Sequence, residues 1–240
     1  MSSALQIHRP GSVEQAVALL GELPQARMVG GGTELVALTR SGLMAHGPWL
    51  TMRSLGLASI GVQAGQLVLG AGATMAAVAR SALVQHEAPA LVQALLASAS
   101  PQVRNVATLG GNLLQRTRCP YYRGQAPACN KLRPGSGCAV RSGDQRQAAL
   151  FGTSAQCVAS HASDLAVALL ALDAELVLQG PHGERRIGIE ALHPEPTLAA
   201  DHEHTLQAGE LISAITLPLS TAARASAYLK LRDRASFQFA

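Results

Sequence analysis

The sequence contains few aromatic and few charged residues. Only 3% of its 240 residues are Phe, Trp or Tyr and 14% are charged, whereas 48% are hydrophobic. A chain of this length and composition buries about three quarters of its unfolded surface, which excludes disorder for most of it. The core must consist of Ala, Val, Leu and Ile. The scarcity of aromatic rings also disfavours a protein that stacks nucleic-acid bases on such rings.

Signals for secretion and for a membrane span are also missing. The first ten residues, MSSALQIHRP, contain no basic region followed by an apolar one. The uncharged stretch 54–79 is interrupted by glycines and glutamines, which predicts strands and turns and no membrane insertion.

No Ser/His/Asp arrangement and no HExxH pair is present, and His202 and His204 are expected to be solvated. Hydrolytic chemistry therefore has no support.

Basic residues are concentrated in one segment. The net charge of the chain is +4, and residues 116–146 hold seven Lys or Arg side chains against one acidic residue, Asp144. The rest of the chain is therefore slightly acidic. Such a segment contacts an acidic partner subunit or nucleic acid, or it is an ordinary solvated face.

Apolar periodicity and capping residues predict a mixed α/β chain. Helices are expected at 12–20, 34–38, 75–83, 89–99 and 165–172. Hairpins are expected between 60–62 and 67–69 and between 175–178 and 186–189, with further strands at 26–29, 211–217 and 227–232. The stretch 115–152 is rich in proline and glycine and is expected to be an irregular insertion.

All four cysteines lie in or beside this insertion, at Cys119, Cys129, Cys138 and Cys157. Four thiolates at one metal centre would hold such a loop together. Because no CxxC pair is present, zinc is the weaker metal interpretation, and a Cys₄ iron–sulfur cluster tolerates irregular spacing better. Two disulfides or four free thiols are the alternatives, and the missing secretion signal makes disulfides less favoured.

Two glycine turns each follow a short apolar run. The first, at 30–33, precedes a predicted helix and presents successive amide groups that can bind phosphate oxygens. The second lies at 109–112. Neither has GxGxxG spacing, so a Rossmann site is not indicated, and a single turn of this kind is more often structural. Two such turns in one chain favour a ligand that contains pyrophosphate.

Four segments, taken in order, resemble one protein family. They are VGGGTEL at 29–35, ATLGGNL at 107–113, QRTRCPYYR at 115–123 and HASDLAVALLALDAEL at 161–176. This combination resembles the FAD-binding middle subunit of molybdenum hydroxylases, which include xanthine dehydrogenases and carbon monoxide dehydrogenase. The segment QRTRCPYYR, followed by CNK and PGSGC, looks most like the periplasmic aldehyde oxidoreductase branch, whose middle subunit carries an additional [4Fe–4S] cluster.

The resemblance implies an α+β fold of the vanillyl-alcohol-oxidase or PCMH type, with two α/β subdomains that hold FAD and a cysteine-bearing irregular insertion. Residues 1–53 would form the first subdomain and 54–224 the second, which would include an iron–sulfur loop at 115–157. Residues 225–240 would begin a C-terminal domain that is truncated in this sequence.

The resemblance also implies the cofactor-binding residues. Main-chain amides of 27–35 would wrap the pyrophosphate, Asp164 would accept hydrogen bonds from the adenosine half, and Lys230 would lie near the flavin ring. A helix N-cap and an ordinary edge-strand lysine are the structural alternatives for the last two. The complete set is Arg27, Met28, Val29, Gly30, Gly31, Gly32, Thr33, Glu34, Leu35, Thr108, Gly111, Asn112, Asp164 and Lys230. The four cysteines would ligate the cluster, and no catalytic side chain is expected.

The sequence therefore predicts an electron-transfer flavoprotein subunit of an oxidoreductase. Electrons would leave a substrate on a molybdenum-containing large subunit, pass a 2Fe–2S small subunit, and reach FAD here before an external acceptor. We expect a heterotrimer that binds no nucleic acid and folds in the cytoplasm, with export to the periplasm beside a signal-bearing partner as an option. Two alternative interpretations are considered. One is a binding module that is held together by a metal ion and whose basic loop contacts nucleic acid or an acidic partner, and the other is a secreted disulfide-bonded domain.

Overall fold

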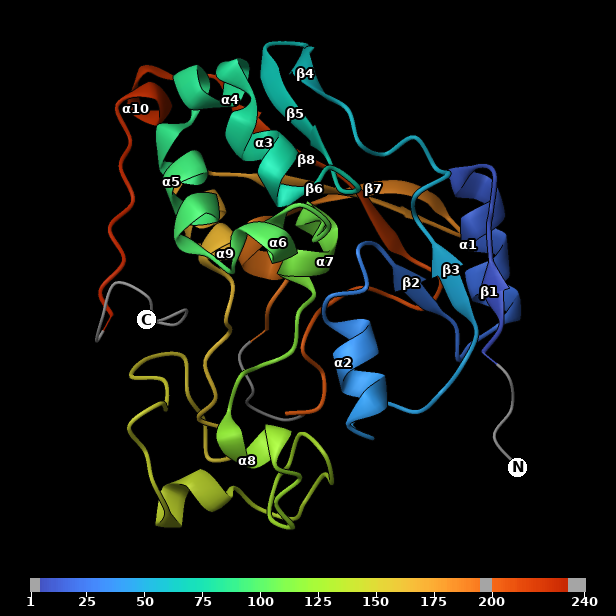
Figure 1. Cartoon of the computed structure of the whole chain (residues 1–240), viewed down its shortest axis with the longest axis vertical. Coiled ribbons are helices and arrows are strands. Elements are labelled where there is room, and N and C mark those ends of the chain that lie inside the picture. The colour runs from blue at the N-terminus through green and yellow to red at the C-terminus, as the bar shows by residue number, and fades with distance from the viewer. Residues whose placement is uncertain (1–4, 195–199, 233–240) are drawn as a thin grey trace. The chain divides into compact units, whose positions relative to one another are not determined.

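The computed structural model describes residues 5–194 and 200–232. The described residues form two compact units, drawn in Figure 1. The first unit comprises 1–113, 163–189 and 206–240, and the second comprises 114–162 and 190–205, within the described part of each range. The predicted irregular insertion thus belongs to the second unit together with a later segment. The predicted boundary at residue 53 falls between two sheets of the first unit and stays a prediction.

A three-stranded parallel sheet is built from the N-terminal part of the first unit. Its order is β1 (Ile7–His8), β3 (Trp49–Thr51) and β2 (Arg27–Val29). Helix α1 (Val13–Glu22) begins where predicted, because the Ser12 hydroxyl accepts a hydrogen bond from the Gln15 amide at 3.2 Å. Helix α2 (Leu35–Arg40) follows β2 after the glycine turn.

A five-stranded antiparallel sheet forms the larger part of the first unit. Its order is β4 (Ile60–Gln63), β5 (Gln66–Gly70), β8 (Leu211–Pro218), β6 (Glu175–Gly180) and β7 (Gly183–Gly188). Both predicted hairpins are confirmed, with Ile60 opposite Leu69 and Val62 opposite Leu67 in the first. Strand β8 lies in the centre of the sheet, and most of its side chains are buried.

Helices cover this sheet and pack on one another, as Figure 1 shows for α3, α5 and α9. The helices of this layer are α3 (Met75–Arg80), α4 (Ala82–Glu87), α5 (Pro89–Ala97), α6 (Pro101–Arg104), α7 (Leu109–Leu113), α9 (Asp164–Ala171) and α10 (Thr221–Arg224). The single helix predicted at 75–83 is wrong. Ser81 has a ψ of 117°, which ends α3, and its hydroxyl caps α4 instead.

Two further expectations need correction. The glycine turn at 109–112 lies within α7, since the Thr108 hydroxyl accepts a hydrogen bond from the Gly111 amide and caps this short helix. Residues 227–232 form no strand among the described residues, and main-chain bonding there goes to a side chain instead. The Tyr228 amide, for example, donates to Oε1 of Gln93 at 2.7 Å. Residues 233–240 of the expected C-terminal domain lie outside the described residues.

The second unit contains little regular structure. Its elements are α8 (Pro120–Arg123), the 3₁₀ helix η1 (Ala139–Ser142) and part of a second 3₁₀ helix, η2 (Ile189–Ala191). An isolated antiparallel bridge pairs Cys129 with Cys138, which brings two of the four cysteines opposite each other. The predicted irregular character of 115–152 is confirmed.

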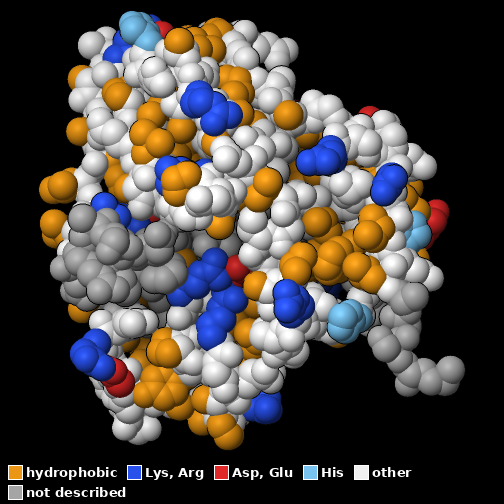
Figure 2. Space-filling view, in the orientation of Figure 1, with side chains coloured by type: hydrophobic (Ala, Val, Ile, Leu, Met, Phe, Trp, Pro, Cys, Tyr) orange, Lys and Arg blue, Asp and Glu red, His pale blue; other side chains and the backbone are white. Residues whose placement is uncertain are grey.

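On the visible face in Figure 2, hydrophobic side chains are scattered and Lys and Arg outnumber Asp and Glu. Within the described residues, none of the helices has the length and apolar character needed to cross a bilayer.

Candidate functional site

The glycine turn after β2 packs directly against the loop that precedes α7. A Cβ atom on Gly30 would overlap the hydroxyl of Thr108, and one on Gly31 would overlap the carbonyl oxygen of Val106. Gly32 has a φ of +71°, which L side chains rarely adopt. The two predicted glycine motifs therefore meet in the structure, although about 75 residues separate them in the sequence. Packing of the chain itself therefore requires glycine at positions 30 and 31, whereas the backbone conformation favours it at position 32.

Main-chain donors of this turn are available to a ligand. Within the described ranges, the amides of Gly31, Gly32 and Thr33 donate to no other group of the chain. Gly31 and Thr33 are exposed. Since backbone N–H groups are strong donors, consecutive exposed ones form a place where an anion can be held without side chains. The predicted residues 27–35 thus comprise β2, this turn and the start of α2.

Helix α7 is tied to the beginning of α9. The side-chain oxygen of Asn112 accepts a hydrogen bond from the Ser163 hydroxyl at 2.6 Å, and Ser163 in turn caps α9 by accepting from the Ala166 amide at 3.0 Å. Ser163 rather than Asp164 is therefore the N-cap of α9, so the N-cap alternative given for Asp164 is wrong. Asn112 and Asp164, both predicted cofactor residues, lie at this junction.

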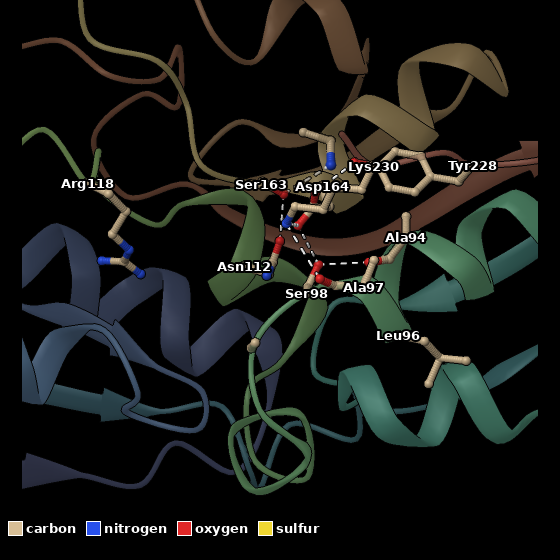
Figure 3. A network of polar contacts seen from close by, with 12 residues as sticks. Ala94, Leu96, Ala97, Ser98, Asn112, Arg118, Ser163, Asp164, Tyr228 and Lys230 are labelled. Atoms are coloured by element: carbon tan, nitrogen blue, oxygen red, sulfur yellow. Dashed lines mark hydrogen bonds and ion pairs between the residues drawn. The ribbon is translucent and has the colours of Figure 1, made fainter. Parts of the chain in front are cut away.

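Asp164 is the centre of a buried polar network, shown in Figure 3. Its Oδ2 atom lies 2.8 Å from Nζ of Lys230 and 2.9 Å from the hydroxyl of Ser98, while Oδ1 accepts from the hydroxyl of Tyr228 at 2.6 Å. The side chains of Asp164 and Lys230 are 9% and 4% exposed. Burial, together with the Asp164 carboxylate, raises the pKa of Tyr228, which therefore stays a hydrogen-bond donor at neutral pH.

The structure thus brings together two residues that the resemblance assigns to different parts of FAD. Asp164 was expected at the adenosine half and Lys230 near the flavin ring, yet the two side chains form an ion pair. Both roles stay predictions.

Sequence reasoning missed Ser98 and Tyr228. Tyr228 lies two positions before Lys230, and in the strand predicted at 227–232 alternate side chains would point to the same side, so this signal was present. Ser98 lies at the end of α5 and offers no such signal.

In the second unit, all four cysteines are free thiols and line one pocket. The other residues of its wall are Tyr121, Tyr122, Ala128, Asn130, Lys131, Ala139, Val140, Gln156 and Ala159, with no carboxylate or imidazole among them. Burial raises the pKa of the Cys157 thiol. Among the described residues, no three potential ligands are arranged to hold a metal ion, so the predicted metal centre is not seen as such.

Asn130 connects three of the cysteine-bearing segments. Its side-chain amide donates to the main-chain oxygen of Gln156 at 2.8 Å, and its side-chain oxygen accepts from the Gly137 amide at 2.8 Å. The residue is 6% exposed. Asn130 is adjacent to Cys129, and its two partners are adjacent to Cys157 and Cys138. No motif or spacing around Asn130 pointed to this role.

Comparison with known proteins gives one family. A family model described as the FAD binding domain in molybdopterin dehydrogenase matches residues 3–220. The aldehyde oxidoreductase FAD-binding subunit PaoB of Escherichia coli K12 is 40% identical over 239 residues, which cover 99% of this chain and 75% of that protein. The carbon monoxide dehydrogenase medium chain of Afipia carboxidovorans is 25% identical, and the match covers 95% of this chain and 63% of that one.

Solved structures share the fold. The carbon monoxide dehydrogenase from Hydrogenophaga pseudoflava that lacks the Mo-pyranopterin moiety aligns with a TM-score of 0.69 at 22% identity, covering 100% of this chain and 67% of that one. The chain therefore spans about three quarters of one curated relative and less than two thirds of the medium chain from Afipia.

Proposed function

The chain belongs to the family of FAD-binding domains of molybdopterin dehydrogenases, and on that premise we propose that it is the electron-transferring flavin subunit of a molybdenum-dependent oxidoreductase. The predicted family and fold class are confirmed by the family match and by the shared fold. The observation that carries the proposal is the meeting of the two glycine motifs beside amides that donate to no group of the described chain.

In this proposal the chain holds FAD chiefly through its main chain. The amides at 31–33 bind the pyrophosphate, and Thr108, Gly111 and Asn112 support its other side. When bound, FAD supplies redox chemistry that accepts electrons from a donor and passes them on to an external acceptor. The proposal assigns no acid or base chemistry to the side chains of this chain.

Asp164 keeps some capacity to bind the cofactor. A carboxylate has about four acceptor positions, and the Ser98, Tyr228 and Lys230 side chains use three of them. Counting the described residues only, one position on Oδ1 is left, and we propose that it accepts a donor from FAD while Lys230 keeps the carboxylate oriented. This arrangement supports a role of Asp164 in binding one hydrogen-bond donor of the cofactor.

We propose further that the second unit holds a [4Fe–4S] cluster on Cys119, Cys129, Cys138 and Cys157. The support is a pocket wall that contains all four thiols and, among the described residues, no carboxylate or imidazole. Each thiolate of such a cluster binds a different iron atom, so the ligands lie farther apart than around a single zinc ion. Four protein ligands leave no open position, which fits an electron relay rather than a substrate site.

The same comparison supports a proposal on partners. PaoB and the Afipia protein are named as a subunit and a medium chain, and we propose that this chain likewise assembles with a molybdenum-containing large subunit and a 2Fe–2S small subunit. Oxidation of an aldehyde on the large subunit is the activity that the similarity to PaoB favours. Folding in the cytoplasm, with export beside a signal-bearing partner, is the proposed route.

The pyrophosphate assignment is tested by comparing flavins. We would remove bound flavin from the full chain and titrate it with FAD, FMN and riboflavin, following flavin fluorescence. FMN lacks the pyrophosphate link and the adenosine, so we expect FAD to bind more than about tenfold tighter, or about 1.4 kcal/mol. Equal affinities for FAD and FMN would contradict the assignment.

The cluster is tested by replacing each cysteine with serine and measuring iron, acid-labile sulfide and zinc per chain. Iron and sulfide should fall together in every variant, while FAD content changes less. One zinc and no sulfide in the wild type would show that the four cysteines form a structural zinc site and not an electron-transfer cluster. Neither metal, with thiols that react only after reduction, would point to disulfides.

A further inference from the structure

A buried ion pair lies at the wall of the four-cysteine pocket. Lys131 follows Cys129 by two residues and, of the described residues lining the pocket, is the one with a fixed charge. Its Nζ atom lies 2.9 Å from Oε1 of Glu203 and donates to the carbonyl oxygen of Ala200 at 3.0 Å. The Lys131 and Glu203 side chains are only 10% and 13% exposed. Water therefore screens this pair far less than it screens a surface pair.

Glu203 comes from a segment that contains no cysteine. The described residues of 190–205 join the cysteine-bearing residues 114–162 in the second unit, and both Glu203 and the Ala200 carbonyl contact the pocket residue Lys131. The Glu203 carboxylate also lies 2.7 Å from Nη1 of Arg116, near the start of the cysteine-bearing segment. Glu203 thus fixes the lysine by an ion pair and at the same time offsets part of its charge.

A charge at this position affects an anionic redox centre in a predictable direction. An iron–sulfur cluster held by four thiolates is negatively charged, and reduction adds one electron to it. A nearby cation stabilises the reduced form more than the oxidised form and raises the reduction potential, whereas a nearby carboxylate lowers it. The effect is larger where water is excluded.

We infer that Lys131 and Glu203 set the reduction potential of the cluster: Lys131 is the cation at the pocket wall, and Glu203 is a positioning residue that holds it there. This inference rests on the proposed [4Fe–4S] cluster. It assigns a function to residues outside the cysteine set and explains why a basic side chain is buried beside four thiols.

The test is a redox titration of the full chain with dithionite, in which the cluster takes up one electron and its reduced form is followed by electron paramagnetic resonance. Lys131→Met keeps an unbranched side chain without the charge and should lower the potential. Glu203→Gln keeps an oxygen acceptor without the charge and should raise it. We expect about a tenfold change in the ratio of reduced to oxidised cluster at a fixed ambient potential, which is about 59 mV for one electron.

Two control variants separate charge from structure. Arg133 lies in the same loop, is exposed and donates to the carbonyl oxygens of Ala126 and Pro127, so Arg133→Met should leave the potential unchanged. Lys131→Arg should restore most of the wild-type value. If Lys131→Met does not retain a cluster, the rise expected for Glu203→Gln still decides the question.

The outcomes distinguish this inference from the proposal on which it rests. A wild-type chain without iron and sulfide would overturn both. If the wild-type chain holds a cluster but neither variant changes its reduction potential, the inference alone is overturned. The same holds if both variants shift the potential in the same direction, because loss of the ion pair would then act only through structure.

Discussion

Nζ of Lys230 lies 2.8 Å from Oδ2 of Asp164, and both side chains are almost completely buried. Lys230 comes from the segment after α10, which has no regular secondary structure among the described residues, while Asp164 begins α9. The pair therefore attaches the end of the described chain to the helical layer of the first unit. It also places two predicted cofactor residues at one point.

Lys230→Met should destabilise the first unit by about 3–5 kcal/mol, because it leaves a buried carboxylate without its cation. The double variant Asp164→Asn/Lys230→Met should recover part of this loss, since no uncompensated charge remains. Denaturant unfolding of the two single variants and the double variant measures the coupling. Strictly additive losses would contradict the ion-pair account.

The single variants Asp164→Asn and Lys230→Met also test whether these two residues act on one part of FAD. We expect each to lower FAD retention and to change the visible flavin spectrum in the same way. A spectrum altered by Lys230→Met but unaffected by Asp164→Asn would show that the residues serve different ends of the cofactor, as the resemblance alone implied.

The glycine turn calls for a substitution that spares the packing of the chain. Gly31→Val would force a side chain into the Val106 carbonyl, so loss of FAD in that variant would report on folding. Gly32→Ala is the better test, because the new Cβ would lie 3.4 Å from Val36 without a clash. The main destabilisation then comes from the φ of +71°. We expect it to cost about 1–2 kcal/mol and to weaken FAD binding.

The matched control is Gly21→Ala in α1, where a Cβ would have no atom within 4 Å. This change should stabilise the chain by about 0.5–1 kcal/mol and leave FAD binding as it is. Calorimetric titration of both variants with FAD measures the two affinities. Unchanged affinity in Gly32→Ala would argue against a cradle formed by this turn.

Asn130→Ala should loosen the cysteine pocket without removing a ligand. The change breaks the hydrogen bonds that join the segments of Cys129, Cys138 and Cys157, and we expect lower iron and sulfide per chain together with faster proteolysis of the loop. Asn105→Ala, at the exposed end of α6 in the other unit, is the control. Full iron and sulfide content in Asn130→Ala would refute this role.

Stability should also depend on pH through His193. Burial lowers the pKa of this imidazole from its ordinary value of 6.5, and its ring lies 4.0 Å from that of His161 between centroids. Below about pH 6.5 the unfolded chain binds a proton that the folded chain resists, so stability falls as the pH drops toward the lowered pKa and is constant above 6.5. We would measure the unfolding free energy at about pH 5.5 and about pH 7.5, and His193→Gln should reduce the difference between the two values. An equal slope in both proteins would contradict the assignment.

Local signals predicted most of the elements. Ser12, Pro89 and Ser163 begin helices at the expected places, and both hairpins have the expected residues opposite each other. The errors occurred where tertiary contacts decide the conformation. Residues 227–232 read as a strand because their side chains alternate, but Tyr228 and Lys230 bind Asp164 and the backbone pairs with no strand of the described chain.

The candidate site was predictable in its parts and not in its connections. The glycine motifs and the cysteines were identified from composition and spacing, whereas the contact of Gly31 with the Val106 carbonyl depends on how β2 and α7 are brought together. Likewise, Lys131 was one basic residue among several, and its ion pair with Glu203 requires a segment about 70 residues away to fold onto the cysteine loop.

The most direct test of this account is the cofactor content of the purified full chain, measured as FAD, iron, acid-labile sulfide and zinc in one sample alongside its absorption spectrum. We expect one FAD, four irons and four sulfides per chain, with flavin bands superimposed on broad iron–sulfur absorption and no zinc. A colourless chain that takes up no FAD on reconstitution would contradict the central claim, and a yellow chain with neither iron nor sulfide would reduce it to a flavin subunit without the cluster.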